Sequence, residues 1–327
     1  MSKPLQGKIA VVTGATRGAG RGIACMLGEA GATVYCTGRS VRGRIATAGR
    51  SETIEETAEM VTAHGGEGIA VKVDHTVESE VVALFERIAE ERPHLDILVN
   101  DVWGGDALTE WSKMFWELDI EKGMTMFHRA VHGHILTSRH AFPLLAKADH
   151  GLIVEVTDGD HMGYRLNLYY DLVKTAVIRL AFGMSRELAK YPITALAVTP
   201  GFLRSEAMLD HFGVTEENWR DGVAKDPHFI ASETPFYVGR AIAALAADPN
   251  VAAKAGRVFS SWDLALEYDF VDVDGRQPIW SRHLLETTGQ NFVACDEAFY
   301  DKYCSDGPLE TLFSDWPPGP ESSGDRK

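Results

Sequence analysis

The chain has 327 residues, of which 45% are hydrophobic, and its 47 acidic and 32 basic residues give a formal net charge of -15. A chain of this length and composition can bury a full core as one large domain. The negative charge repels nucleic acid and anionic membrane surfaces at long range, so we expect neither as a partner. The first six residues lack an apolar signal core, and no later run reaches the roughly 18 apolar residues of a membrane helix.

Short apolar runs rich in β-branched residues alternate with helical segments along most of the chain. The expected strands are Ile9–Val12, Thr33–Cys36, Ile69–Val73, Asp96–Val99, Leu152–Val156, Ala195–Thr199 and Arg257–Ser260. The expected helices are Gly20–Ala30, Glu52–His64, Val77–Arg92, Ile120–Lys147, Tyr169–Lys190 and Thr234–Ala247. Nearly continuous apolar strands separated by helices predict a doubly wound α/β fold of the Rossmann type, with about seven parallel strands and helices on both faces.

The chain shows no internal repeat and no domain linker. We therefore expect one domain over residues 1–295, with a C-terminal extension that starts near residue 260, where the periodicity is lost. Residues 296–327 include a charged end rich in Pro, Gly and Ser and are predicted to form a mobile tail. Cys25, Cys36, Cys295 and Cys304 have neither metal nor disulfide spacing, and the first two fall in a helix and a strand that should be buried. This usage predicts a cytoplasmic protein.

A glycine-rich turn joins the first strand to the first helix. Gly14 permits a sharp exit from the strand, Gly18 lets the backbone approach a pyrophosphate, and Gly20 lets the helix lie close to the sheet. The following helix offers free N–H groups and a positive dipole end to phosphate. Thr16 and Arg17 belong to the same turn, which we interpret as a nucleotide-binding site.

The end of the second strand indicates which dinucleotide is preferred. Folds that select NAD place a carboxylate there, but this chain has Cys36-Thr37-Gly38-Arg39 and no acidic residue before Glu52. Arginine binds phosphate through paired, charge-assisted hydrogen bonds, so Arg39 and Arg17 are the expected ligands of an NADP(H) 2′-phosphate. The alternative, a solvated basic loop, applies better to Arg44 and Arg50.

Tyr170 and Lys174 lie four residues apart on an expected helix and therefore share one face. A cation within about 4–6 Å can lower the pKa of a phenol from about 10 by about 1–3 units, which would make Tyr170 a usable proton donor. Such a pair can also simply pack on a helix surface. Tyr169 points elsewhere and is expected to pack or to form a pocket wall.

These marks together resemble the short-chain dehydrogenase/reductase family. They are Thr13-Gly14-x-x-x-Gly18-x-Gly20, Asp74 and Asn100 after the third and fourth strands, Tyr170-x-x-x-Lys174, and Pro200-Gly201 after the sixth strand. The segments Asp263–Tyr268 and Asp272–Arg276 resemble the dehydrogenase/reductase member 1 branch, which implies NADPH-linked carbonyl reduction. By this resemblance Asp74 lies against the adenine, Asn100 lines the cofactor groove, Gly201 approaches the nicotinamide, and Ser205 replaces a threonine near its amide. The family often forms homodimers or homotetramers.

The sequence departs from the family pattern at three places. The run Asn100-Asp101-Val102-Trp103-Gly104-Gly105 adds a bulky ring, and the catalytic asparagine of the fifth helix has no counterpart in the region His128–His134. The strand-end serine that binds the substrate carbonyl aligns with Asp158, while Thr157 should face away from Tyr170. An ionised carboxylate only accepts hydrogen bonds, so two roles are open for Asp158. It could hold a proton, or it could bind a hydroxyl or cationic group of a specialised substrate, which we favour because the loop around His161 is expected to be accessible.

His128, His132 and His134 could suggest a metal, but no acidic or cysteine partner at zinc spacing accompanies them, so no metal site is expected. A helix packing interface suits them better. Aromatic and methionine side chains before the long fifth helix and after Pro200-Gly201 suit an apolar or aromatic substrate, although some will belong to the core; they are Trp103, Trp111, Met114, Phe115, Trp116, Met208, Leu209, Phe212 and Trp219.

The sequence thus predicts an oxidoreductase that uses NADP(H) to interconvert a small carbonyl compound and its alcohol. Tyr170 would donate the proton, Lys174 would tune it, and Asp158 would contact the substrate. The alternative is an NADP(H)-binding protein with lost or minimal catalysis that acts as a sensor or scaffold.

Overall fold

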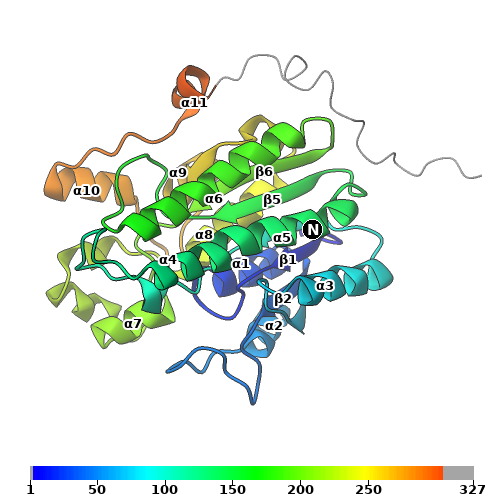
Figure 1. Cartoon of the computed structure of the whole chain (residues 1–327), viewed down its shortest axis with the longest axis horizontal. Helices are drawn as coiled ribbons and strands as arrows, with labels where there is room; N and C mark the ends of the chain where they lie inside the picture. The colour runs from blue at the N-terminus through cyan, green and yellow to red at the C-terminus, as the bar shows by residue number, and fades with distance from the viewer. Residues whose placement is uncertain (1–2, 305–327) are drawn as a thin grey trace, which may run out of the picture.

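A computed structural model describes residues 3–304 and shows seven parallel strands in one sheet. They are β1 (Ile9–Val12), β2 (Thr33–Gly38), β3 (Glu67–Lys72), β4 (Ile97–Asn100), β5 (Gly151–Val156), β6 (Ile193–Thr199) and β7 (Val258–Ser260). The spatial order is β3-β2-β1-β4-β5-β6-β7, so the direction of winding changes between β1 and β4 (Figure 1). The predicted doubly wound fold is confirmed.

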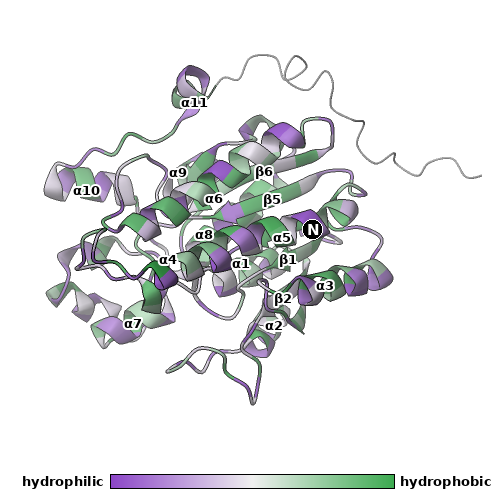
Figure 2. Ribbon diagram, in the orientation of Figure 1, coloured by the Kyte–Doolittle hydropathy of each residue, from purple (hydrophilic) through white to green (hydrophobic). Residues whose placement is uncertain are grey.

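Helices cover both faces of the sheet (Figure 1). The helices nearest the sheet are α1 (Gly18–Glu29), α2 (Ile54–Ala63), α3 (Glu78–Glu91), α4 (Ile120–Phe127), α5 (Gly133–Leu145), α6 (Leu168–Glu187) and α8 (Pro235–Ala247). One buried cluster joins α1 and α8 to the sheet, and another joins α3 and α5 to its opposite face. Figure 2 shows the hydrophobic residues concentrated along the central strands, as the apolar runs predict. None of the helices formed by residues 3–304 is both long enough and apolar enough to cross a membrane.

The long helix expected over residues 120–147 is interrupted. Between α4 and α5 the backbone makes a π-helical turn over His128–His132. A buried polar contact lies just after this turn: His134 Nδ1, on α5, lies 2.6 Å from a carboxylate oxygen of Glu155 on β5. The π-helical turn therefore lies just before the point where α5 contacts the buried Glu155 of the sheet. Such turns are frequent near functional sites.

Helices α1 and α8 approach each other closely because α1 has a glycine at the contact. A Cβ atom on Gly22 would lie 2.0 Å from the backbone oxygen of Pro235, the first residue of α8. No side chain fits there without moving a helix. Gly183 on α6 offers a contrast, since a Cβ there meets nothing within 4 Å.

The region after β7 is more ordered than the sequence suggests. It forms α9 (Ser261–Tyr268), α10 (Trp280–Thr288) and α11 (Glu297–Tyr303). The last of these lies in the predicted tail, and its Phe299 and Tyr300 pack against a buried cluster that contains Cys295. A helix there was not foreseen, and the rest of the predicted tail, residues 305–327, lies outside the described residues.

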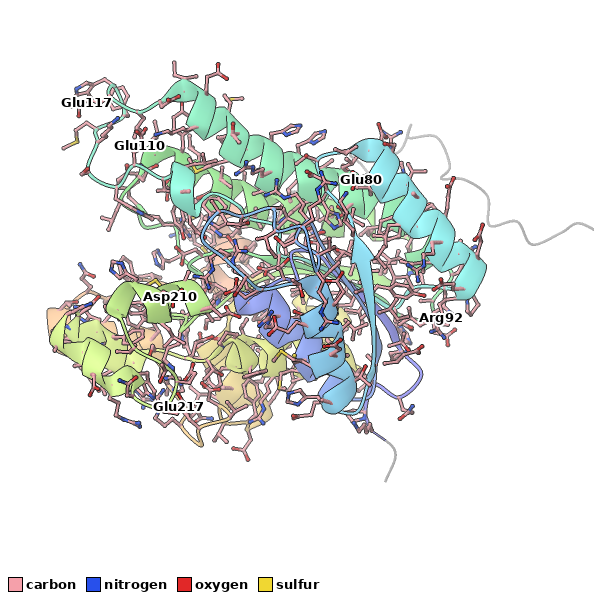
Figure 3. All side chains as sticks on the ribbon, turned by 90° about the horizontal axis from the view of Figure 1, so that it is seen from below. Glu80, Arg92, Glu110, Glu117, Asp210 and Glu217 are labelled. Atoms are coloured by element: carbon pink, nitrogen blue, oxygen red, sulfur yellow. The ribbon has the colours of Figure 1, made fainter. Side chains whose placement is uncertain are left out.

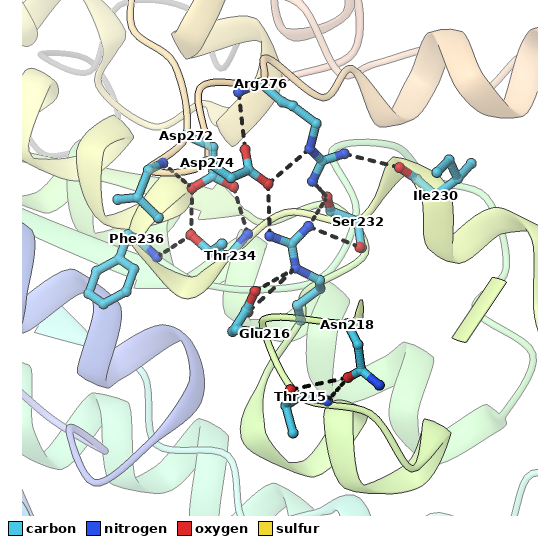
Figure 4. A network of polar contacts seen from close by, with 12 residues as sticks. Thr215, Glu216, Asn218, Ile230, Ser232, Thr234, Phe236, Asp272, Asp274 and Arg276 are labelled. Carbon is cyan, nitrogen blue, oxygen red and sulfur yellow. Dashed lines mark hydrogen bonds and ion pairs between the residues drawn. The ribbon is translucent and has the colours of Figure 1, made fainter. Parts of the chain in front are cut away.

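A polar network fastens this C-terminal region to the segment before α8 (Figure 4). The fully buried Arg204 lies 3.0 Å from Asp274, whose carboxylate also pairs with Arg276 at 2.9 Å. The Asp272 carboxylate accepts hydrogen bonds from the backbone and side chain of Thr234, which caps α8. The extension is thereby built into the domain.

Candidate active site

A cleft of about 1510 Å³ opens at the carboxyl ends of the strands. The residues that follow β1 and β4 line it, together with residues that follow β2, β3, β5 and β6. The change in winding direction between β1 and β4 separates the loops there, and in open α/β sheets ligands bind at this place. One half of the cleft carries the glycine turn, and the other half carries Tyr170 and the C-terminal extension.

The glycine turn has the geometry that its sequence predicts. Gly14 and Gly18 have φ values of 71° and 56°, in the left-handed region that favours glycine, and both line the cleft. A Cβ on Gly20 would lie 2.5 Å from the backbone oxygen of Gly14, so this glycine allows α1 to lie close to the turn. Thr16 is buried and lines the cleft beside them. The Gly18 N–H, at the positive end of α1, donates to Oε2 of Glu206 at 2.8 Å.

Basic side chains surround the same half of the cleft. Arg17 and Arg39 both line it, and Arg39 lies 3.8 Å from Asp74, which follows β3. Burial acts to raise the pKa of Asp74, but hydrogen bonds from Thr76 and the charge of Arg39 outweigh it and hold that pKa below its usual value. Arg129 also lines this part, and its guanidinium donates to the backbone oxygen of Gly104. The sequence did not predict that Arg129 lines the cleft, because a single arginine within a helical segment has no recognisable motif.

Two other arginines of the expected basic loop have different surroundings. Arg44 is exposed. Arg50 is held by Glu52 and by Asp210 on α7 (Glu206–Phe212). Arg50 nevertheless lines the cleft together with Arg17 and Arg39.

Asn100 lies beneath the cleft instead of in its wall, which corrects the expectation that it lines the cofactor groove. It is fully buried, and its amide donates to Glu155 at 2.7 Å and to Ser138 at 2.9 Å. Glu155 also pairs with His134, whose Nε2 lies 3.0 Å from the backbone oxygen of Val102. This buried chain of contacts supports the loop after β4, whose residues Asp101, Val102 and Trp103 line the cleft.

Pro200, Gly201 and Ser205 line the cleft after β6. The Gly201 N–H donates to Glu233 at 2.9 Å, and a Cβ on this glycine would lie 3.1 Å from Trp280. Ser205 is the N-cap of α7, where its hydroxyl accepts from Met208 N at 3.3 Å. Glu233 was not foreseen: it is buried, also accepts from Ser261, and its pKa is raised to about 8 by burial.

Tyr170, Lys174 and Asp158 meet in the other half of the cleft. The Tyr170 hydroxyl donates to Oδ2 of Asp158 at 2.8 Å. Lys174 lies one turn further along α6, with its Nζ 5.6 Å from the centre of the Tyr170 ring. Thr157 faces α6 and donates to the Lys174 carbonyl at 2.7 Å, so it points away from the Tyr170 hydroxyl as expected.

The electrostatics of these groups correct one expectation. The pKa of Tyr170 is raised well above its ordinary value, first by burial and then by the charge and hydrogen bond of Asp158, whereas the sequence predicted that Lys174 would lower it. Burial lowers the pKa of Lys174, although the Asp158 and Asp101 carboxylates act in the opposite direction. Tyr170 is therefore firmly protonated near neutral pH.

Asp101 is a further titratable group in the cleft that the sequence analysis named only as a departure. Burial raises its pKa to about 7, while Lys174 and His134 act to lower it. Its backbone N–H donates to Thr13 at 3.0 Å, which ties the end of β4 to the end of β1. The only sign of it in the sequence was an acidic residue directly after Asn100, in the run that departs from the family pattern.

The loop after Asp158 is held from inside the protein. Arg165 is buried and donates to the backbone oxygens of Asp158, Gly159 and His161, while it pairs with Asp171 at 3.1 Å. His161 stacks on Phe292 with ring centres 4.1 Å apart, and Cys295 N donates to Asp160 at 2.7 Å. The loop that we expected to be accessible is thus half covered by the C-terminal extension.

That extension supplies much of the second wall of the cleft. Its lining residues are Ile279, Trp280, Ser281, Arg282, Leu284, Leu285, Thr288, Gln290, Asn291, Phe292 and Ala294. The hydrophobic pattern of this region has no regular period, so its place in the cleft wall could not be predicted from the sequence. In Figure 3, Glu110 and Glu117 mark the loop before α4 in the upper left of the view, and Asp210 marks α7 below them.

The aromatic residues named from the sequence divide into three groups. Trp103 and Met208 line the cleft, and Trp111 contacts Tyr170 with ring centres 5.0 Å apart. Met114, Phe115 and Trp116 are 60%, 65% and 70% exposed. Phe212 and Trp219 are buried in a separate cluster into which Leu209 packs. Tyr169 packs on Gly123, as expected.

The histidines of the broken helix are not gathered around one point. His128 and His132 stack with ring centres 4.8 Å apart, while His134 is buried against Glu155. Within residues 3–304, no group of three or more His, Cys, Asp or Glu side chains is arranged to hold a metal ion. Cys25 and Cys36 are buried, as predicted, and all four cysteines are free.

Comparison with known proteins places this site in a family. Residues 8–212 match the family model described as short chain dehydrogenase. The dehydrogenase/reductase SDR family member 1 proteins of Mus musculus and Homo sapiens are 36% and 35% identical over 281 residues, which cover 84% of this chain and 86% of each relative. A 3-oxoacyl-[acyl-carrier-protein] reductase of Vibrio harveyi is 33% identical over 239 residues, 71% of this chain and 90% of its own length.

Solved structures agree on the fold. A short chain dehydrogenase from Mycobacterium thermoresistibile superposes with a TM-score of 0.70 at 19% identity, covering 89% of this chain and 95% of its own. A putative dehydrogenase from Xanthomonas campestris has a TM-score of 0.68 at 22% identity and covers 84% and 93% of the two chains. The chain that forms this cleft therefore belongs to the short-chain dehydrogenase family of oxidoreductases, and it is similar to member 1 of the dehydrogenase/reductase group.

Proposed function

We propose that this protein is an NADP(H)-dependent oxidoreductase that interconverts a carbonyl compound and its alcohol. The observation that carries the proposal is that one cleft holds the glycine turn, two arginines at its mouth, and Tyr170 with Lys174 beside them. Nucleotide binding and proton transfer can therefore take place side by side.

The residues present fit the cofactor. Gly14 and Gly18 have the left-handed φ values that give the turn its shape, and Arg17 and Arg39 offer the donor pattern that a 2′-phosphate needs. Thr16, Gly20 and Asp74 complete that half, and Pro200, Gly201 and Ser205 border the other end, where Tyr170 and Lys174 lie. When bound, the nicotinamide supplies a hydride to the substrate carbon.

Tyr170 holds the proton for the substrate oxygen. Its raised pKa keeps the hydroxyl protonated near neutral pH, so the proton is present for transfer, but it also makes Tyr170 a weaker acid than a phenol whose pKa lies near the working pH. Lys174 places a positive charge nearby, which favours the tyrosinate left after transfer. Asp158 accepts the Tyr170 hydrogen bond with one oxygen and also lines the cleft.

We propose that Asp158 also binds a hydroxyl or cationic group of the substrate. A carboxylate opposes the negative charge that builds on a carbonyl oxygen, so it is a poor substitute for a serine donor at that atom. The walls formed by Trp103, Phe202, Met208, Trp280 and Phe292 suit an apolar or aromatic body. The expected substrate therefore combines an apolar frame with one donor group near the carbonyl.

A second candidate function is NADP(H) binding with little turnover, as in a sensor or scaffold. The observation that favours it is that the Tyr170 hydroxyl already donates its hydrogen bond to Asp158, the residue that stands where the family has a serine. Calorimetric titration with NADPH, together with NADPH oxidation across a panel of ketones and aldehydes, separates the two. Binding with turnover that Tyr170→Phe abolishes supports the reductase, and binding without turnover on any carbonyl supports the second candidate.

We further propose a homodimer or homotetramer in the cytoplasm. The family relationship supports assembly. The four free cysteines suit a reducing compartment. Light scattering of the purified protein at several concentrations would give its molar mass and test the assembly directly.

A further inference from the structure

Trp103 contacts both Tyr170, the proposed proton donor, and Lys174, the cation beside it. The Lys174 Nζ is 4.4 Å from the centre of its ring, within the range of a cation–π contact. The same ring meets Tyr170 edge to face, with ring centres 5.3 Å apart and planes at 90°. One side chain therefore contacts both the cation and the acid.

The loop is shaped to hold this ring. Gly104 has a φ of 60°, and a Cβ on Gly105 would lie 2.3 Å from the Trp103 ring, so both positions suit glycine. The indole N–H donates to Asp106 at 2.6 Å, which fixes the ring from its other side. Behind it, the backbone oxygen of Val102 contacts the buried His134. The indole is thus positioned by its own loop and by the network under the sheet.

The ammonium of Lys174 has reason to need such a contact. Burial lowers its pKa, and the neutral amine would no longer favour the tyrosinate. An aromatic face stabilises a cation without adding a negative charge to a cleft that already holds Asp101, Asp106 and Asp158. A further carboxylate would raise the pKa of Tyr170 still more, whereas an indole does not.

We propose that Trp103 is a positioning residue for the reaction: its ring face keeps Lys174 protonated and in place, and its edge fixes the orientation of Tyr170. The inference rests on the proposed function for its catalytic consequence. The contact with Lys174 stands independently of it, and the two are therefore tested by different measurements.

The first measurement is the pKa of Lys174 in the free protein. Protein labelled with [13Cε]lysine is titrated by NMR, and the Lys174 resonance is assigned by its loss in Lys174→Arg. Trp103→Leu should lower the pKa of Lys174 by about one unit, because a buried cation–π contact is worth a change of this size, and Trp103→Phe should lower it less. The matched control is Trp111→Leu, which removes another Tyr170 neighbour and should leave the pKa of Lys174 unchanged.

A second variant set covers the case in which Trp103→Leu does not fold. Incorporating 5-fluorotryptophan withdraws electrons from the ring face with little change of shape. It should lower the pKa of Lys174 in the unmodified sequence and not in Trp103→Phe, where the other tryptophans are still labelled. An unchanged Lys174 pKa in Trp103→Leu, or an equal fluorine effect in both proteins, would overturn the contact.

The second measurement is catalysis. With the best carbonyl substrate, Trp103→Leu should lower kcat about tenfold, and Trp103→Phe should recover most of the loss. A kcat within twofold of the wild type, despite a shifted Lys174 pKa, would overturn the positioning role. If no carbonyl is reduced by the wild type, the proposed function fails, while the NMR titration still decides whether Trp103 holds Lys174.

Discussion

The hydroxyl of Tyr170 donates a 2.8 Å hydrogen bond to Oδ2 of Asp158. In a serine-bearing relative of this family the equivalent neighbour could share its own proton, but a carboxylate only accepts. Together with burial, Asp158 raises the pKa of Tyr170. The pair therefore keeps the proton on the tyrosine, so that Tyr170 is protonated at the start of a reduction but is a weaker acid than a free phenol.

This pair makes the substitutions at Asp158 informative. If Asp158 binds a donor group of the substrate, Asp158→Ala and Asp158→Ser should each lower kcat/KM for the true substrate more than about tenfold, while Ser improves simple ketones. If Asp158 instead donates a hydrogen bond through a held proton, Asp158→Ser should be tolerated, because serine also donates. Steady-state kinetics of the three proteins from pH 5 to 9 distinguish these roles. Unchanged activity in both variants would make Asp158 a bystander.

Tyr170→Phe should abolish turnover and leave the affinity for NADPH nearly intact, because only the transferable proton is removed. Lys174→Ala should damage both, since Lys174 lines the cleft beside Tyr170 and carries a charge. Single-turnover absorbance of NADPH and calorimetry give the two quantities. Near-native activity in Tyr170→Phe would require another acid in the cleft.

The cofactor preference follows from the basic side of the cleft. NADPH should bind at least about tenfold more tightly than NADH, roughly 1.4 kcal/mol, and Arg39→Ala should remove most of this difference. Arg17→Ala is expected to act in the same direction. Arg44→Ala serves as the control, because Arg44 is an exposed arginine of the same loop. Equal affinities of the wild type for the two cofactors would refute the assignment.

Glu233 predicts a pH dependence of stability. Burial raises its pKa from 4.5 to about 8, so the folded protein keeps this proton over a range in which the unfolded chain has lost it. The contribution to stability is thus full below pH 4.5 and is lost progressively as pH rises to about 8, at no more than about 1.4 kcal/mol per pH unit. Glu233→Gln cannot ionise, so its free energy of unfolding should gain on that of the wild type over this window. Urea unfolding at pH 5, 7 and 9 measures the difference, and parallel curves would contradict the shift.

Two glycines provide a test of the packing. Gly22→Ala should lower the free energy of unfolding by about 1–3 kcal/mol or more, because the new methyl group would collide with the backbone of α8. Gly183→Ala meets open space on α6 and should raise it by about 0.5–1 kcal/mol, because alanine has the higher helix propensity. Urea unfolding compares the two with the wild type. A stabilised Gly22→Ala would show that α1 and α8 are not in contact as described.

The sequence predicted the sheet well because each strand is a continuous apolar run between helical segments, so that burial on both faces leaves a clear pattern. It also predicted Gly14, Gly18, Tyr170 and Lys174, whose spacing along one turn or one helix face brings them together locally. It misplaced Asn100, because the direction of a strand-end side chain depends on what lies beneath it, here Glu155 and Ser138. It missed the pKa shift of Tyr170, because the effect of Asp158 needs a distance between two elements. Long-range contacts of this kind leave no period in the chain.

The family match ends at residue 212, yet the cleft continues along α10 and the stretch after it, up to Ala294. Tyr170, Lys174 and the glycine turn precede residue 212 in the chain, whereas a large part of the cleft wall comes from residues after it. We therefore expect a chimera that exchanges only residues 279–294 with those of a relative to catalyse the same reaction on different substrates. His161, in the loop after β5, and Phe292, in the C-terminal extension, stack on each other across this boundary.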